Sequence, residues 1–394
     1  MRIPNILEII YAPHKAFKKM AENPTIIAPI LIIVLYLVAN VGYAYLSASK
    51  VYVEQMVPNG VTQDEWTQNS TLWRSSNAQV SESSDVINGS NYLNAQYYGN
   101  ASVAFSATGG TQVWMDLESI GTVNCSNPNG YDKLSFRVKW TSPTAKPVNV
   151  TIQLFSANSS NNFYKSLMDD FADSAYNAWS NETISLASEG WSAKSPSADW
   201  GSITGLRLEF TWEESSNLTV LVDGLFFHGP SLSGIDIYGT GYLLNVAFAG
   251  VMQFTITWVI LAGLIYFMSK SFGGKLVWKI MLVVIGTTLI TMVVLAIVNA
   301  IATATVSNVS YPFELITGFR GEAAADTAYN KIADQTVLVD IIGRYGWIAI
   351  QIWTAVLCSV AVRMLAGVSW TKSFLIGATA YVIDLMIGSF LFGI

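Results

Sequence analysis

Few residues in this sequence could carry acid–base or metal chemistry, and they lie far apart along the chain. Histidine occurs only as His14 and His228, so a Ser–His dyad within the apolar segments has no base and an HExxH zinc site has no ligands. No P-loop, GxSxG or dinucleotide fingerprint is present. An intramembrane aspartyl protease needs two facing carboxylates. Only Asp384 lies deep in an apolar run, because Asp340 stands near the edge of its own. The sequence therefore predicts a protein that is not an enzyme.

Asp384 is the one acidic residue at the centre of an apolar run. It lies about eleven residues into that run, near the middle of a membrane at about 1.5 Å per residue, where an ionised acid costs several kcal/mol. One hypothesis is a neutral Asp384 that hydrogen-bonds neighbouring helices. The alternative is a transporter or channel with a proton or cation pathway past Asp384. The predicted partners at similar depth are Gln351, Thr354, Cys358, Thr287, Thr288, Thr291, Gln253, Thr255 and Thr257, and the small residues expected to allow close helix approach are Gly377, Ala380, Gly388 and Gly393.

The elements that must position Asp384 are long apolar segments. The composition is 52% apolar and only 12% charged, and five apolar stretches with at most one charged residue each reach the length that crosses a hydrocarbon core of about 30 Å. The sequence therefore predicts a membrane α-helical bundle of five transmembrane helices. They are residues 25–46, 243–268, 277–305, 346–366 and 373–393.

The distribution of positive charge predicts the orientation of this bundle. If the N-terminus is cytoplasmic, the inner segments and adjacent helix ends carry nine Lys and Arg against two Glu, in agreement with the positive-inside rule. Residues 1–24 are then a cytoplasmic amphipathic segment lying at the membrane interface. Residues 47–240, a loop at 306–343 and the C-terminus are extracellular, at a plasma membrane. The net charge of −6 then belongs mainly to the exterior, and no nucleic-acid partner is expected.

Glycosylation motifs agree with this orientation. Every N-x-[ST] triplet lies in a segment predicted to be external. The two cysteines, Cys125 and Cys358, fall in different compartments and cannot pair. We therefore expect N-linked glycans and no disulfide framework. The candidate glycosylation sites are Asn69, Asn88, Asn100, Asn124, Asn149, Asn158, Asn181, Asn217 and Asn308.

The segment between the first two apolar stretches has the alternation of β-strands. In KLSFRVKW, Leu134, Phe136, Val138 and Trp140 share one face and polar residues the other, and VNVTIQLF and LRLEFTW repeat the pattern. Clusters of Gly, Asn, Pro and Ser separate the runs. The prediction is an extracellular all-β jelly-roll sandwich, inserted between transmembrane helices 1 and 2.

The closing strands carry a resemblance to a known fold. LTVLVDGLFFHG, preceded by DWGSITGLRLEF, resembles the last strands of galactose-binding-like β-sandwiches, which many carbohydrate-binding modules use. That resemblance implies a structural calcium at Asp223, with Glu82 or Asp85 as a second ligand, since oxygen donors suit calcium. The alternative is that Asp223 caps a turn. Of the tryptophans, Trp191 and Trp200 in loops are the candidates for stacking on a glycan.

The apolar segments carry a second resemblance. YAPHKAFKKMAENP, FGGKLVWKIMLVVIGTTLI and the stretch from WIAIQIWTAV to GATAYVI resemble prokaryotic and archaeal members of the Yip1 family. The resemblance implies five crossings with a cytoplasmic N-terminus. A long cytosolic N-terminal region and a DLYGP-type motif are absent, so a GTPase partner is not expected. The large external insertion is also a departure from the family.

Together these patterns predict a non-enzymatic, Yip1-like integral membrane protein in contact with membrane lipid. It would present a glycosylated β-sandwich that binds a glycan, an envelope polymer or a partner protein at the outer face. The abundant acceptor triplets without a disulfide suggest an archaeal cell envelope. The alternative function is transport past Asp384.

Overall fold

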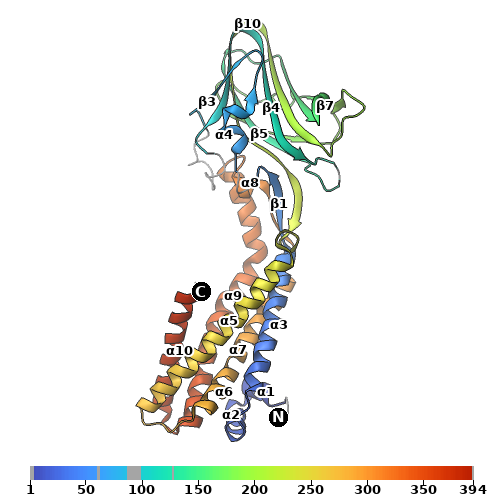
Figure 1. Ribbon diagram of the computed structural model, residues 1–394. Helices are drawn as coiled ribbons and strands as arrows, with labels where there is room; N and C mark the ends of the chain where they lie inside the picture. Colours follow the sequence, from blue (N-terminus) through green and yellow to red (C-terminus); the bar gives the residue numbers. More distant parts are fainter. Residues whose placement is uncertain (1–3, 60–62, 87–98, 127, 393–394) are drawn as a thin grey trace. The chain divides into compact units, whose positions relative to one another are not determined.

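Two compact units make up the chain. The computed structural model describes residues 4–59, 63–86, 99–126 and 128–392 (Figure 1). The helical unit comprises Met1–Val51, Ser233–Val309 and Ala333–Ile394, and the β unit comprises Tyr52–Leu232 and Ser310–Ile332. Each unit is thus assembled from stretches that are distant in the sequence.

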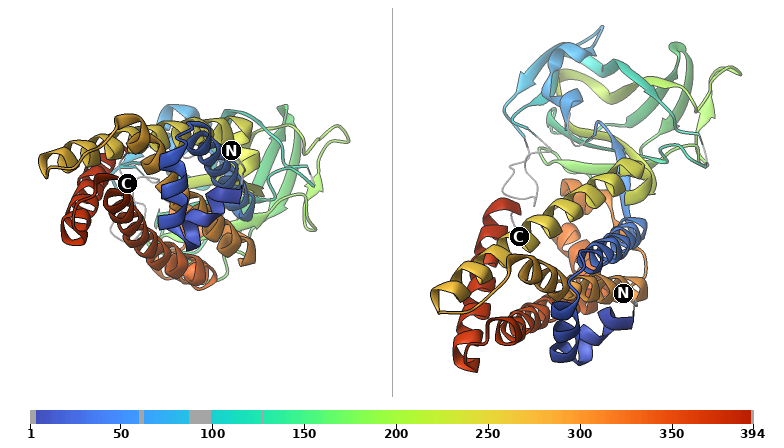
Figure 2. Two further views of the ribbon diagram at one scale, coloured as in Figure 1. Left: turned by 90° about the horizontal axis from the view of Figure 1, so that it is seen from below. Right: turned by 60° about the horizontal axis from the view of Figure 1, so that its bottom comes forward.

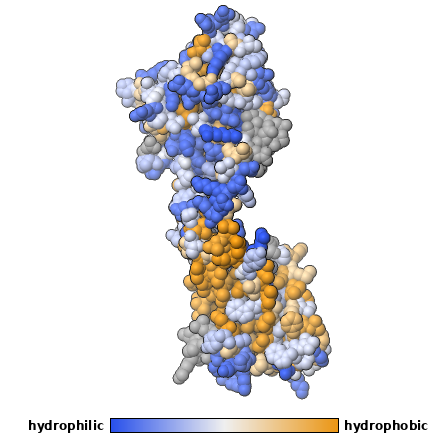
Figure 3. Space-filling model, turned by 180° about the vertical axis from the view of Figure 1, so that it is seen from behind, coloured by the Kyte–Doolittle hydropathy of each residue, from blue (hydrophilic) through white to orange (hydrophobic). Residues whose placement is uncertain are grey.

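The helical unit consists of long apolar helices. Among the described residues, five stretches are long and apolar enough to cross a membrane, namely Ile27–Lys50, Gly234–Ser271, Trp278–Thr305, Ala323–Ala366 and Trp370–Leu391. Their outer surface is predominantly apolar (Figure 3), with Leu244 72% and Phe390 88% exposed. The helices are α1 (Pro4–Tyr11), α2 (Pro13–Glu22), α3 (Ile27–Lys50), α5 (Gly234–Ser271), α6 (Trp278–Thr288), α7 (Ile290–Thr305), α9 (Glu322–Ala366) and α10 (Trp370–Phe392).

Local sequence signals explain where α5 begins and ends. The Ser233 hydroxyl accepts the Asp236 N–H at 3.2 Å, an N-cap that starts the helix ahead of the apolar run predicted from residue 243. Gly239 interrupts the helical backbone with a φ of 63°, a conformation that glycine adopts at little cost. Gly273, with a φ of 83°, lies in the turn that follows α5, in a conformation that glycine adopts at little cost.

Helix contacts in this unit depend on small residues and apolar side chains. A Cβ on Gly286 would lie 2.3 Å from the Trp258 indole and 2.7 Å from Pro29, so only glycine lets α6 approach α3 and α5 here. α10 packs against α5 (Figure 2). The apolar side of α2, including Phe17 and Met20, is buried in the core of the unit against α6. The helices α1 and α2, within the segment predicted to lie at the membrane interface, therefore also pack on the other helices.

The β unit is built on two long strands, β4 (Ser102–Val123) and β10 (Ile203–Ser233). Residues 112–118 of β4 pair with 205–211 of β10, and residues 103–107 pair with 218–222, with register shifts between Thr211 and Leu218. The first half of β10 continues into β6, β7 and β9, and the second half into β5 and β8. The other strands are β1 (Val51–Val57), β2 (Trp73–Arg74), β3 (Gln79–Ser83), β5 (Lys133–Ser142), β6 (Asn149–Ser156), β7 (Asn158–Ser166), β8 (Ser180–Ser185), β9 (Ser192–Ala193) and β11 (Val309–Tyr311), with short helices α4 (Glu65–Gln68) and α8 (Phe313–Thr317).

The core of the β unit lies between the two halves of this bent sheet. Leu206, Leu208 and Phe210 from the first half of β10 join Val220 and Val222 from the second half in one buried cluster. The predicted inner face of β5, Leu134 to Trp140 at alternate positions, lies in the same cluster. The β-rich domain predicted from the alternating pattern is therefore confirmed.

The segment 310–332 is where the prediction from sequence is wrong. Residues 306–343 are predicted to be a loop, but residues 313–317 form α8 and residues from 322 onward form α9. β11 pairs with β1, and Phe313 and Phe319 pack against Phe226. The β unit therefore needs this later segment in addition to the predicted insertion, 47–240.

This segment also buries the face of β5 that the sequence predicts to be polar and exposed. Ser135 and Arg137 are both 0% exposed, and the Arg137 guanidinium lies 5.0 Å from the centroid of the Phe319 ring. A cation over an aromatic face is a favourable contact. Period-two alternation identified the inner face of β5 correctly, but the outer face is covered as well.

Candidate functional site

The outward side chains of the β4–β10–β6–β7 half-sheet form a surface that we call the polar face. Its members are Trp114, Asp116, Thr151, Gln153, Asn162, Tyr164, Arg207 and Glu209. Because successive strand residues point to opposite faces, these alternate with core residues such as Met115, Ile152 and Leu208. The register places Asp116, Arg207, Gln153 and Tyr164 in one row across four strands. At about 4.8 Å per strand, the row spans about 14 Å.

The charged groups of the polar face hold one another in fixed positions. Arg207 donates two hydrogen bonds to Asp116, at 2.5 and 2.6 Å, and its guanidinium lies 4.6 Å from the centroid of the Trp114 ring. The hydrogen bond to Asp116, and then the charges of nearby acids, raise the pKa of Arg207 above its ordinary value. A bidentate pair of this kind is geometrically specific, so the arrangement is preorganised.

Several polar atoms on this face lack a partner. Among the described residues, none hydrogen-bonds to the Thr151 hydroxyl, the Asn162 carbonyl oxygen or the Trp114 indole N–H. Thr151 is 1% and Asn162 5% exposed, and a buried polar group without a partner is costly. These atoms are themselves buried, so a ligand on the polar face would reach them only if neighbouring side chains moved.

The two tryptophans predicted to stack on a glycan lie together. Trp200 stacks on Phe163 with 3.9 Å between ring centroids, and Trp191 meets Trp200 edge-on at 5.3 Å. The Trp191 indole N–H donates to the Ser185 carbonyl at 2.9 Å. Both are half-buried against the β-unit core. The Phe163 and Trp191 contacts take up part of the ring surface predicted to receive a sugar.

Asp223, the predicted calcium ligand, is buried beside a second acid that sequence reasoning missed. Asp64, 1% exposed, accepts a short hydrogen bond from the Thr67 hydroxyl, which also lies 3.5 Å from Asp223. The Gly224 N–H donates to Thr67 at 3.0 Å. Burial, and then the negative charge of Asp223, raise the pKa of Asp64 well above its ordinary value.

The acids predicted as second calcium ligands lie elsewhere. Asp85 pairs with Lys139 at 2.7 Å, and Glu82 is exposed on β3. The carboxylates of Asp64 and Asp223 and the Thr67 hydroxyl are the kind of oxygen donors that calcium takes. The described residues contain no group of three His, Cys, Asp or Glu side chains placed to hold a metal. A calcium ion here would need further oxygen ligands from backbone or water.

A buried cluster in the β unit has the Ser–His–acid arrangement of a hydrolase triad. The imidazole of His228 lies 2.8 Å from the Ser135 hydroxyl and 2.7 Å from the Glu54 carboxylate. Ser135 is 0% and His228 2% exposed, and the Phe313 ring stacks on the imidazole with 4.0 Å between centroids. A substrate would have to displace Phe313 to reach the serine.

The interactions of this cluster are structural. Burial raises the pKa of Glu54, but hydrogen bonds from His228 and from the Phe313 N–H, at 2.8 Å, outweigh burial and lower it below its ordinary value. Glu54 therefore holds the segment 310–332 onto the sheet as a carboxylate.

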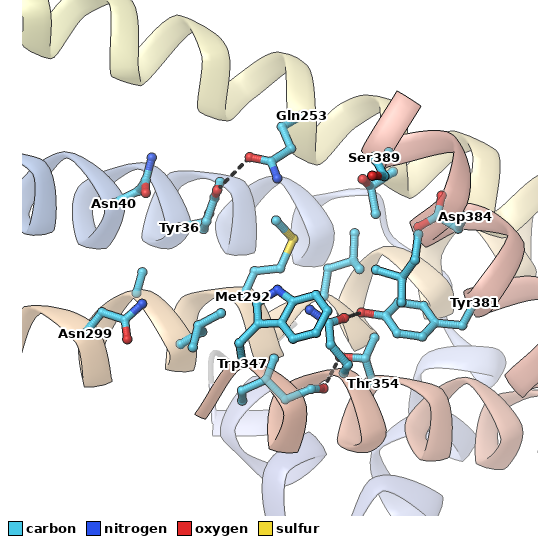
Figure 4. A pocket seen from close by; sticks show the side chains of 18 of the residues that line it. Tyr36, Asn40, Gln253, Met292, Asn299, Trp347, Thr354, Tyr381, Asp384 and Ser389 are labelled. Atoms are coloured by element: carbon cyan, nitrogen blue, oxygen red, sulfur yellow. Dashed lines mark hydrogen bonds between the residues drawn. The ribbon is translucent and has the colours of Figure 1, made fainter. Parts of the chain in front are cut away.

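In the helical unit, Asp384 lines an open cavity of about 500 Å³ between α3, α5, α7, α9 and α10 (Figure 4). Of the nine residues predicted to share the depth of Asp384, four line this cavity with it, namely Gln253, Thr257, Gln351 and Thr354. The other five are not among its lining residues, namely Thr255, Thr287, Thr288, Thr291 and Cys358. Asp384 is 4% exposed. It makes none of the predicted interhelical hydrogen bonds to any residue that the structure describes.

Other side chains provide the interhelical hydrogen bonds expected of Asp384. Tyr36 donates to Gln253 at 3.3 Å, and Tyr381 donates a short bond to Gln351. Thr291 and Thr354 share a hydrogen bond of 2.7 Å, and Thr288 contacts Cys358 at 3.7 Å. The polar contacts between helices exist, but their donors are tyrosines and threonines.

The candidate glycosylation sites lie at the surface where they are described. Asn149, at the start of β6, is half-buried, and Asn88 lies outside the described residues. Asn69 accepts hydrogen bonds from the N–H and hydroxyl of Thr71 in its own triplet, and Asn181 accepts from Arg137 at 3.0 Å. The exposed sites are Asn69, Asn100, Asn124, Asn158, Asn181, Asn217 and Asn308.

Comparison with known proteins gives only remote structural likenesses. An exo-β-agarase structure matches with a TM-score of 0.30 and 11% identity, over 43% of this chain and 24% of that chain. A family 11 carbohydrate-binding module of Clostridium thermocellum matches with a TM-score of 0.27 and 16% identity, over 45% of this chain and 95% of the module. A family 30 carbohydrate-binding module gives 0.28 and 12%, over 45% and 89%. Likenesses at this level do not identify a ligand.

No protein-family model and no curated protein matches the chain. The resemblance to the Yip1 family therefore stays a prediction.

Proposed function

We propose that this chain is a non-enzymatic integral membrane protein whose β unit lies outside the cell and binds a glycan through the polar face. The observation that supports this most directly is the row from Asp116 through Arg207 and Gln153 to Tyr164, flanked by Trp114. The helical unit would be the anchor, with five crossings and a cytoplasmic N-terminus.

The chemistry of the polar face suits a sugar. Carboxylate, guanidinium and amide groups each present two polar atoms in a plane, which match neighbouring hydroxyls of a sugar ring. Aromatic rings provide apolar surface for the C–H side of the same ring.

The helical unit supports the membrane assignment through its surface. Large apolar side chains, such as Phe248 and Phe267 at 70% each, are exposed on it, as side chains facing lipid would be. The lysines of the inner segments and the exposed acceptor asparagines favour the proposed orientation. Glycosidase digestion of the purified chain tests it, because attached glycans would place the β unit outside.

We further propose that Asp64 and Asp223 form the structural calcium site, with Asp64 in the position that the resemblance would give to Glu82 or Asp85. Thr67 would add a hydroxyl ligand, and a bound cation would offset the mutual repulsion of the two carboxylates.

Glycan binding is tested with the full chain in nanodiscs on an array of glycans and envelope polysaccharides. A fragment limited to residues 50–235 would lack the segment 310–332 that completes the β unit. The wild-type chain should retain at least one glycan class, and Trp114→Ala and Gln153→Ala should each weaken retention about tenfold or more. That loss corresponds to about 1.4 kcal/mol.

Matched variants distinguish the polar face from other surfaces. Thr219→Ala changes a partly exposed polar residue on the other half of β10 and should leave retention unchanged. Trp191→Ala and Trp200→Ala test the loop tryptophans. If only these two variants lose binding, the site is the tryptophan cluster, and the proposal for the polar face is wrong. If no glycan is retained, a partner protein is the remaining ligand class.

A further inference from the structure

The helical unit contains a second site of a different chemistry. We infer that its cavity binds a lipid-like amphiphile with an uncharged, hydroxyl-bearing head. At about 500 Å³ the cavity lies within the usual range for small-molecule sites, about 300–1,000 Å³. This inference does not depend on glycan binding by the β unit.

The polar wall of the cavity is rich in carboxamides. Asn40, Gln253, Asn299 and Gln351 all line it, from four different helices (Figure 4). The carbonyl oxygens of the two glutamines accept from tyrosines. Their NH₂ groups, and both ends of Asn40 and Asn299, have no hydrogen-bond partner among the residues that the structure describes.

Hydroxyl groups fit these carboxamides best. An amide presents a hydrogen-bond donor and an acceptor side by side, and a hydroxyl group can hydrogen-bond to either. Polar groups in an apolar bundle are costly without partners. A ligand with several hydroxyls would satisfy more of them than one with a single charged atom.

The charge of the lining excludes an anionic head. Among the residues that the structure describes, Asp384 is the only ionisable acid or base lining the cavity apart from tyrosines, and no Lys, Arg or His lines it. A phosphate or carboxylate ligand would therefore have no cationic partner and would approach Asp384 with the same sign of charge. A quaternary ammonium would suit Asp384 but, because it has no N–H or O–H, it would give no hydrogen bond to Asn40 or Asn299 or to the NH₂ groups of Gln253 and Gln351.

The remaining wall suits an alkyl chain. Leu289, Leu295, Ile350 and Leu385 are apolar, Met292 and Met386 are flexible, and Trp347 adds a flat ring (Figure 4). A ligand that is half hydroxylated and half alkyl therefore matches both walls. An alkyl glycoside is the simplest probe of that class.

One glycine offers a way to fill the site. Gly388 lines the cavity, and a Cβ built on it meets no atom within 4 Å. Gly388→Leu should therefore occupy the cavity without a clash at its Cβ. Gly263, on α5, also meets nothing within 4 Å and does not line the cavity, so Gly263→Leu is the matched control.

The experiment compares three C10 amphiphiles, namely decyl glucoside, decyl phosphate and decyltrimethylammonium. Each is dialysed to equilibrium, below its critical micelle concentration, against the full chain held in amphipol. Decyl glucoside should bind saturably, one per chain, and at least tenfold more tightly than the other two. Gly388→Leu should weaken its binding at least tenfold, and Gly263→Leu should not.

Two further variants assign the polar contacts. Asn299→Leu keeps the size of the side chain but removes the amide, so decyl glucoside should bind roughly threefold to tenfold more weakly, as for loss of one hydrogen bond. Asp384→Asn should leave the glucoside within about threefold, because an amide oxygen also accepts. Protection of Cys358, 0% exposed, from a thiol reagent confirms that each variant is folded.

The alternatives give distinct results. Tighter binding of decyltrimethylammonium, lost in Asp384→Asn, would identify a cation site and overturn the inference. Equal binding of decyl phosphate, or glucoside uptake that does not saturate and is unchanged in folded Gly388→Leu, would overturn it as well.

Discussion

The two units solve the problem of buried polar groups in different ways. In the helical unit, buried hydroxyls mostly bond to their own helix, as Thr288 does to the Ile285 carbonyl and Ser359 to the Ala355 carbonyl, both at 2.8 Å. In the β unit, buried polar groups join distant parts of the chain, as Glu54 does with His228 and with the Phe313 N–H.

This difference follows from the backbone. A helix satisfies its own backbone groups, and its carbonyls also accept nearby hydroxyls. Hydrogen bonds within one helix do not determine which neighbouring helix packs against it. Close packing and small residues must therefore select the neighbours in the helical unit. In the β unit, where the sheet already pairs distant strands, polar networks add further specificity.

The largest expected effect tests the cluster of Glu54, His228 and Phe313, which holds the segment 310–332 on the sheet of the β unit. Phe313→Ala removes a side chain that is 1% exposed and stacked on His228, so the β unit should lose about 3–5 kcal/mol of stability. The measurement is thiol labelling during a denaturant titration, with the labelled cysteine identified by mass spectrometry. Cys125 reports the β unit, because it is 1% exposed and burial raises its thiol pKa to about 12.

The control for this variant is Phe390→Ala, which truncates a phenylalanine that is 88% exposed on the helical unit. It should not change Cys125 labelling. Equal increases in Cys125 and Cys358 labelling in Phe313→Ala would mean that the units do not differ in the way described.

The next effect tests whether small residues select helix neighbours. A Cβ on Gly377 would lie 2.6 Å from the Ser359 backbone nitrogen, so Gly377→Ala should force α9 and α10 apart and cost about 1–3 kcal/mol. Gly388→Ala, on the same helix but in open space, should cost much less. Unfolding in SDS, followed through Cys358, compares the two, and equal losses would contradict this account.

A pH-dependent effect concerns the acid pair of the β unit. Because the pKa of Asp64 is raised on folding, the folded state binds a proton more tightly than the unfolded one. The contribution of Asp64 to the free energy of unfolding should therefore be highest below about pH 4, the unfolded pKa, and fall as pH rises through the folded pKa. The slope can reach about 1.4 kcal/mol per pH unit.

Asp64→Asn should flatten this slope in calcium-free buffer, as measured through Cys125 at a series of pH values. Added calcium should stabilise the wild-type β unit most above the folded pKa, where both acids are ionised. A wild-type profile that is flat in calcium-free buffer would contradict the shared-site account.

The smallest effect concerns a single hydrogen bond between helices. Thr354→Val breaks the 2.7 Å contact with Thr291, and such bonds in membrane bundles average about 0.6 kcal/mol. A double-mutant cycle with Thr291→Val in SDS unfolding measures it. A coupling well above about 1.7 kcal/mol would show that hydroxyls, and not shape, select the partner helix.

The sequence predicted the elements better than it predicted their partners. Apolar length located the apolar part of each long helix among the residues that the structure describes, and alternation identified the inner face of β5, because both signals are local. Nothing local marked Ser135 and Arg137 as buried, since Phe313 and Phe319, which belong to the covering segment, lie more than 170 positions later. Asp384 was placed correctly among polar neighbours, but the direction of its side chain depends on packing. Asp64 was missed because a lone acid before a short helix has no distinguishing pattern.

The interleaving of the two units has a consequence for biosynthesis. The β unit takes its last residues, Ser310–Ile332, from beyond α5, α6 and α7. During translation, Phe313 is synthesised only after those helices, so it can cover His228 only once they have left the ribosome. Until then the strands of the β unit lack their closing segment, so synthesis of these helices sets the earliest time at which the unit can be completed.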